Sequence, residues 1–97
     1  MITFSFKTFG RFKLIISRLE KISSIITVIL NNESCLFLCE NVCLECLDVK
    51  INEGVLPEDG LKFSLQFAYL HNITKNIPAV NTFILKIDNM KYLHVIT

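Results

Sequence analysis

Apolar residues recur along this chain with two different periods, and the order of those periods limits the folds that the chain can adopt. Ile2, Phe4 and Phe6 alternate with polar residues, which is the pattern of a strand with one buried face. The period then changes to that of an amphipathic helix in residues 11–22. The apolar stripe of this helix is Phe12, Ile15, Ile16, Leu19 and Ile22.

The rest of the chain continues with strand-length segments and one further helix. We expect strands in 25–29, 35–39, 42–51, 61–66, 83–87 and 91–96, and a helix in 67–77. Residues 42–51 also fit a helical stripe with Cys35 and Cys39, but the turn residues Glu40 and Asn41 favour a strand. The expected order is therefore β-α-β-β-β followed by β-α-β-β.

This order predicts an α+β fold in which both helices cover one face of an antiparallel sheet. The 97 residues leave room for a single domain, with a first unit in 1–52, an acidic loop in 53–60 and a second unit in 61–97. The second unit lacks a last strand. Because 52% of the residues are hydrophobic, a small monomer cannot bury all of them, and we expect a partner surface.

Charge is strongly segregated although the formal net charge is only +1. Residues 1–32 carry five basic side chains and one acidic one, residues 33–60 carry one basic and seven acidic ones, and residues 61–97 carry four basic and one acidic. Basic residues that share a face can bind nucleic acid whatever the net charge. The longest apolar run, Ile25–Leu30, has six residues, far short of the ~20 that span a membrane.

The expected order resembles one domain of the sliding clamps, the PCNA-like rings that encircle DNA. The resemblance runs over nearly the whole chain and rests on order, spacing and apolar pattern. It is carried by the segments ITFSFKTFG, RFKLIISRLEKIS, SIITVILNNESCLFLCEN, VCLECLDVKI, LKFSLQFAYLHNITKNI and AVNTFILKIDNMKYLHVIT. LFLCEN after the hairpin turn and the acidic loop are most similar to the N-terminal domain of the Hus-type subunit of the DNA-damage checkpoint clamp.

The resemblance implies a non-catalytic clamp subunit, or a fragment of one, that helps to encircle duplex DNA in the DNA damage response or in replication. Its partners would be duplex DNA, bound without sequence preference, and other clamp subunits or copies of itself, in the nucleus or the cytosol. It implies no cofactor. The implied DNA-facing residues are Arg11, Lys13, Arg18, Lys21 and Lys75, with His71 and Asn72 as further candidates. Clamp subunits have a second domain and a connecting loop, which this chain lacks.

One alternative to a clamp is a protein that does not bind DNA. The basic helix faces are also explained as ordinary solvated surfaces, because basic amphipathic helices are common. The chain would then be a small homo-oligomeric interaction protein that pairs sheet edges and does not bind DNA.

Four cysteines lie within twelve residues, at Cys35, Cys39, Cys43 and Cys46. Only the last pair has zinc-knuckle spacing, and apolar residues flank them all, so we expect buried free thiols rather than a metal site or a disulfide. A cysteine-rich metal-binding module is the third hypothesis. His71 and His94 suggest no catalytic arrangement, and we expect no enzyme.

Overall fold

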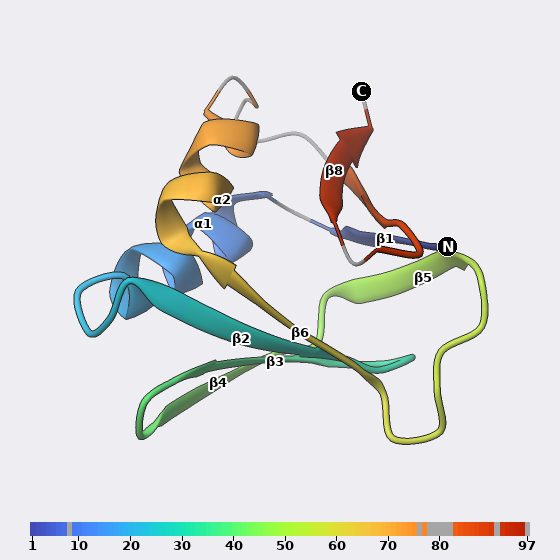
Figure 1. The fold of residues 1–97 in the computed structure, drawn as a ribbon, viewed down its shortest axis with the longest axis horizontal. Coiled ribbons are helices and arrows are strands. Elements are labelled where there is room, and N and C mark those ends of the chain that lie inside the picture. The colour runs from blue at the N-terminus through green and yellow to red at the C-terminus, as the bar shows by residue number, and fades with distance from the viewer. Residues whose placement is uncertain (8, 76, 78–82, 91, 97) are drawn as a thin grey trace.

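The structure, a computed structural model, describes residues 1–7, 9–75, 77, 83–90 and 92–96. These residues form two helices and eight strands, and the α+β class is confirmed (Figure 1). The elements are β1 (Ile2–Phe6), α1 (Phe9–Leu19), β2 (Ile25–Leu30), β3 (Cys35–Cys39), β4 (Val42–Cys46), β5 (Val49–Glu53), β6 (Leu61–Gln66), α2 (Phe67–Thr74), β7 (Phe83–Ile87) and β8 (Leu93–Ile96).

The strands form two antiparallel sheets where the sequence predicted one. Sheet A has the order β5-β1-β7-β8 and sheet B has the order β4-β3-β2-β6. Figure 1 shows sheet B along the bottom of the molecule and sheet A at the upper right, with both helices at the upper left. The helices therefore lie on the inner side of sheet B, and the prediction of a single helix-covered sheet was wrong.

The second sheet arises because the predicted strand 42–51 is two strands, β4 and β5, which belong to different sheets. In β4 the inward side chains are at even positions, such as Leu44 and Cys46, whereas in β5 Val49 and Ile51 point inward. A continuous strand cannot place both sets on one face, because side chains alternate strictly. The chain therefore breaks between the strands, at residues 47–48, and the backbone N–H of Lys7 donates to the carbonyl of Asp48 at 3.1 Å.

The two predicted units each contribute strands to both sheets. The segments β1-α1-β2-β3 and β6-α2-β7-β8 have the same order, and β1 pairs with β7 while β6 pairs with β2. In register, Phe4 lies opposite Leu85 and Val28 lies opposite Phe63. Each sheet thus contains strands of both units, so neither unit has a complete sheet of its own.

The core lies between the inner faces of the two sheets and the helices. The ring centroid of Phe12 in α1 lies 5.1 Å from that of Phe6 in β1 and 5.9 Å from that of Phe37 in β3. One helix and both sheets therefore meet in a single aromatic cluster. Phe67 and Leu70 are the buried side chains of α2.

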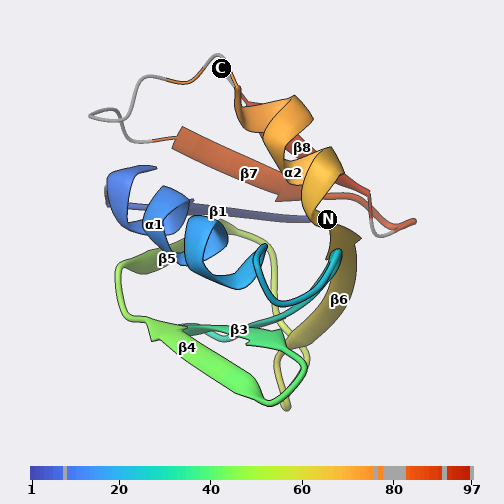
Figure 2. The same cartoon turned by 90° about the vertical axis from the view of Figure 1, so that its left-hand side faces the viewer.

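Both helices are shorter than predicted at their C-terminal ends. Helix α1 ends at Leu19, where the sequence predicted residue 22, and α2 ends at Thr74 with Lys75 as its C-cap, where the sequence predicted residue 77. The backbone N–H of Ile22 donates to the carbonyl of Leu19, so the chain turns directly after α1. Figure 2 shows the two helices side by side on the same side of the molecule.

Candidate nucleic-acid interface

The five predicted DNA-facing cations are all exposed and all belong to the helical side of the molecule. Four of them are in α1 and the turn that follows it, and one caps α2: Arg11, Lys13, Arg18, Lys21 and Lys75. We call this surface the helix surface. The local sequence explains the exposure, because an amphipathic helix that buries Phe12 and Leu19 must turn its other side to solvent.

The structure divides four of these cations between two flanks of α1 instead of placing them on one continuous face, and Lys21 lies in the turn after the helix. Lys13 lies on the flank beside α2, where it lines a groove together with Lys75. Arg11 and Arg18 lie on the opposite flank, towards β4, in a second groove that includes Glu45. The predicted basic face is therefore two basic edges.

An uncharged strip separates these two edges along the outermost side of α1. It consists of exposed residues at helical spacing, Gly10, Leu14 and Ser17. Leu14 is 53% exposed although it is a large apolar residue. The pattern of residues 11–22 predicts a basic outer side for this helix, and Leu14 lies on that side as well. Leu14 lies two positions after Phe12 in the helix, and this spacing places its side chain away from the apolar stripe.

The groove between the helices has an apolar floor and basic rims. It encloses about 270 Å³, with Phe12, Ile16 and Leu70 at its base. The hydroxyl of Thr74 donates to the carbonyl of Leu70 at 2.6 Å, so this side chain is turned towards its own helix. An extended anion could lie along the rims, between Lys13 and Lys75, without entering the floor.

Acidic partners neutralise part of the basic charge. The ring of His71 is hydrogen-bonded to the carboxylate of Glu20, which links the two helices across 51 positions of sequence. The guanidinium of Arg11 lies 3.6 Å from the carboxylate of Asp48. His71 is therefore already engaged with a carboxylate, while the neighbouring Asn72 is exposed. No local sequence pattern predicts the pairing of His71 with Glu20.

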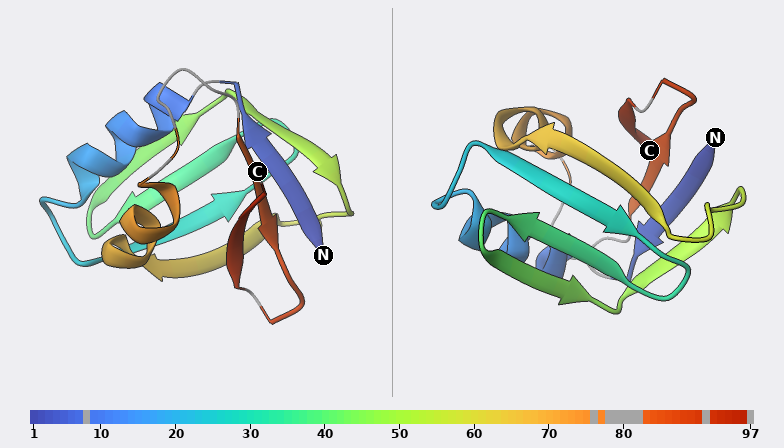
Figure 3. Two further views of the ribbon diagram at one scale, coloured as in Figure 1. Left: turned by 90° about the horizontal axis from the view of Figure 1, so that it is seen from above. Right: turned by 60° about the horizontal axis from the view of Figure 1, so that its bottom comes forward.

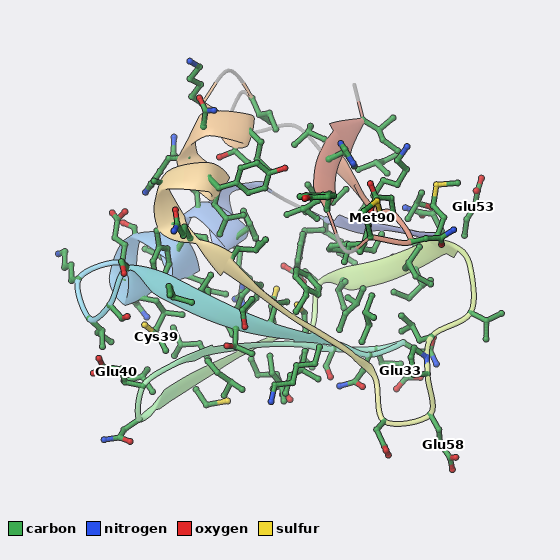
Figure 4. All side chains as sticks on the ribbon, in the orientation of Figure 1. Glu33, Cys39, Glu40, Glu53, Glu58 and Met90 are labelled. Atoms are coloured by element: carbon green, nitrogen blue, oxygen red, sulfur yellow. The ribbon has the colours of Figure 1, made fainter. Side chains whose placement is uncertain are left out.

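The acidic loop lies far from the helix surface. Figure 4 shows Glu33, Glu53 and Glu58 at the end of the molecule opposite to the helices. Only part of the acidic segment is therefore separated from the helices, because Glu45 and Asp48 lie beside Arg11 and Figure 4 shows Glu40 at the helical end. Near the helices Glu20, Glu45 and Asp48 offset part of the charge of the five exposed cations.

The four cysteines do not converge on one point. Cys35, Cys39 and Cys46 are buried, whereas Cys43 is exposed, so the prediction of burial was wrong for Cys43. The spacing from Cys43 to Cys46 is odd, and within one strand this places the two side chains on opposite faces. Among the described residues no group of three or more His, Cys, Asp or Glu side chains is arranged to hold a metal ion.

His94 lies in strand β8 of sheet A, away from the grooves beside the helices. Its ring lies 2.9 Å from the carboxylate of Asp88, and this hydrogen bond is the main reason why the pKa of Asp88 is lowered. The same carboxylate accepts hydrogen bonds from the backbone N–H groups of Met90 and Tyr92. Asp88 therefore stabilises the turn between β7 and β8.

Comparisons of the chain with protein-family models, with curated proteins and with solved structures found no match. The resemblance to the sliding clamps accordingly remains a prediction from order and pattern. Within the described residues, neither helix has the length and apolar character needed to cross a lipid bilayer.

Proposed function

We propose that this chain is a non-catalytic, clamp-like subunit whose helix surface faces the backbone of duplex DNA. The observation that carries the proposal is the position of the two helices, which lie side by side (Figure 2), with five exposed cations in the helices or directly after them. The acidic residues of the loop lie at the opposite end (Figure 4). This polarity favours a polyanion on the helical side.

Two separate basic edges are better suited to contacts with the phosphates of the DNA backbone than to recognition of a base sequence. Lysine and arginine side chains on either side of α1 reach phosphates as flexible point charges and read no base edges. The uncharged strip at Leu14 lies between these edges. The long basic side chains on either side can reach phosphates while this strip itself makes no contact with the DNA. Binding through a few such contacts is weak, non-specific and dependent on salt.

Clamp-like assembly would supply the affinity that such contacts lack. A ring holds DNA by enclosure, and its subunits are other clamp subunits or further copies of the same chain. We place this activity in the nucleus, or in the cytosol before assembly, and assign it no cofactor and no catalytic step. The two-unit order β1-α1-β2-β3 and β6-α2-β7-β8 supports the clamp interpretation.

The test compares two double charge reversals that change the net charge equally. Lys13→Glu with Lys21→Glu alters the helix surface, and Lys50→Glu with Lys86→Glu alters the strands of sheet A. Binding to a fluorescent 30-base-pair duplex is measured by anisotropy from low to physiological salt. We expect the helix variant to bind at least about tenfold more weakly, with a shallower salt dependence, and the sheet variant to stay within about threefold of wild type.

Equal losses in both variants, or wild-type affinity in the helix variant, would contradict the proposal. Exposed charges alter stability by less than about 0.5 kcal/mol, so both variants should melt near the wild-type temperature. If wild type itself fails to bind duplex DNA at low salt, alone or in its assembled form, the alternative of an interaction protein without DNA binding is the better explanation. The free edges of β4, β5, β6 and β8 favour that alternative.

A further inference from the structure

The outer face of sheet B has no element packed against it among the described residues. The helices and sheet A cover the inner face, and Figure 3 (right) shows β6, β2, β3 and β4 in front with α1 and α2 behind them. Side chains on this outer face come from alternate positions of each strand. Four of them, Ile25, Ile29, Leu36 and Leu38, are large apolar side chains on the side of the sheet that is normally polar.

Strand register arranges these side chains in two rows that cross all four strands. In the first row Lys62 lies opposite Ile29, Ile29 opposite Leu36, and Leu36 opposite Glu45. The second row, by the same pairings, is Ser64, Thr27, Leu38 and Cys43. Ile25, which is 51% exposed, continues the apolar centre along β2. The face therefore has an apolar centre and opposite charges at its two ends.

This arrangement is complementary to itself. Consider a twofold axis that runs parallel to the strands, between β2 and β3, and relates two copies packed face to face. The axis reverses the order of the strands, so Lys62 of one copy lies over Glu45 of the other, and Ile29 lies over Leu36. A twofold interface requires such reciprocal contacts. Lys62 and Glu45 are exposed and take part in no ion pair within the described part of the chain.

We propose that two copies of this chain associate through the outer faces of their B sheets, with Lys62 and Glu45 forming reciprocal ion pairs around an apolar centre. Two sheets pack face to face about 10 Å apart when their inner side chains are apolar. Leu36, Leu38 and Ile29 supply that apolar layer. The charged ends fix the relative orientation, because the other face-to-face twofold places like charges together.

The size of the face sets the strength of the association. Four strands at ~4.8 Å spacing and five residues at ~3.4 Å give a footprint on the order of 15 by 17 Å. Two such faces bury on the order of 500 Å², well below the roughly 1,200–2,000 Å² of stable interfaces, so the association is weak. We therefore expect a reversible dimer with a Kd on the order of 10–100 µM.

The dimer does not depend on the proposed DNA function. Its interface lies on the side of sheet B away from both helices (Figure 3), and of its charged residues only Glu45, on the edge strand β4, also lines the groove beside Arg11. It also differs from the pairing of free strand edges, because it uses side chains on a face and leaves the backbone groups of the edges unchanged. Failure of either proposal therefore leaves the other standing.

Charge exchange between the two ends of the first row provides the test. Sedimentation equilibrium over about 5 to 500 µM measures the Kd of wild type, Lys62→Glu, Glu45→Lys and the variant that carries both changes. Each single change places like charges at positions 62 and 45 opposite each other across the dimer. It should therefore raise the Kd by at least about tenfold. The double change restores opposite charges and should return the Kd to within about threefold of wild type.

A matched pair on sheet A controls for general charge effects. Lys50→Glu and Glu53→Lys make the same changes of charge on β5 and should leave the Kd unchanged. A monomeric wild type at the highest concentration would overturn the proposal. So would single variants that dimerise normally, or a folded double variant that fails to recover.

Thiol cross-linking gives a second readout that does not rely on charge. In the dimer Cys43 of one copy faces Ser64 of the other, whereas within one chain these residues stand three strands apart, roughly 14 Å. With a bismaleimide of about 8 Å, too short to join residues at that separation, Ser64→Cys should form a covalent dimer and wild type should not. A Ser64→Cys variant that stays monomeric under these conditions contradicts the interface.

Discussion

At the scale of single residues, Cys43 differs from the other three cysteines in its surroundings. Burial is the main cause that raises the pKa of Cys35, Cys39 and Cys46, and the nearby Cys46 raises that of Cys35 further. The thiol of Cys39 also donates to the carbonyl of Leu19 at 3.5 Å. Protonated and enclosed thiols react slowly because the thiolate is the reactive form.

We predict that a thiol reagent such as Ellman's modifies one cysteine rapidly in the folded protein and four after denaturation. Cys43→Ser should remove the rapid phase, whereas Cys46→Ser should leave it unchanged. The four thiols should be free, and elemental analysis should find no stoichiometric zinc. Rapid modification of more than one thiol in folded wild type, or bound zinc, would show that the cysteines are arranged differently.

At the scale of elements, the hairpin between β3 and β4 contains an unfavourable backbone conformation. Its two-residue turn is Glu40 and Asn41, because Cys39 pairs with Val42. Glu40 has φ = 52° and is the only non-glycine residue of the described chain with positive φ. A side chain in this region costs about 1–2 kcal/mol, which glycine avoids.

We predict that Glu40→Gly raises the free energy of unfolding by about 0.5 kcal/mol, since the relief of strain exceeds the added flexibility of the unfolded chain. Urea denaturation and a melting temperature higher by about 2–4 °C would show this. Asn41→Gly is the control, because Asn41 does not have positive φ and its replacement should reduce stability. A loss of stability in both variants would argue against the described turn.

At the scale of the whole molecule, the aromatic cluster joins the two sheets into one folding unit. Phe37 of sheet B is 1% exposed, and its ring lies 6.2 Å from that of Phe6 in sheet A. Phe12 of α1 contacts both rings. Since each sheet also contains strands of both sequence units, neither sheet can keep its core without the other.

We predict that Phe37→Ala lowers the free energy of unfolding by about 3–5 kcal/mol, the usual loss when a buried aromatic ring leaves a cavity. Leu14→Ala is the control for a half-exposed apolar residue and should change stability by less than about 0.5 kcal/mol. In wild type, far-ultraviolet circular dichroism and tyrosine fluorescence should report one coincident transition. Separate transitions for the two probes would mean that the sheets unfold independently.

The sequence by itself determined the class of the fold and the sites of its elements. The strands at residues 2–6 and 35–39, and both helices, follow from periods of 2 and 3.6 that a short segment carries alone. The exposure of Arg11, Lys13 and Arg18 follows from the same amphipathic pattern. These properties are local, because they depend on which side of one element is apolar.

Only the tertiary structure decided how the elements combine. The division into two sheets at residues 47–48, the contribution of each unit to both sheets, the bond from Glu20 to His71 and the rows across sheet B all join residues far apart in sequence. The number of sheets and the rows of side chains on the outer face of sheet B follow from these long-range pairings. Their physical reason is that strand pairing and register are set by which apolar faces can be buried together, and no single segment contains that information.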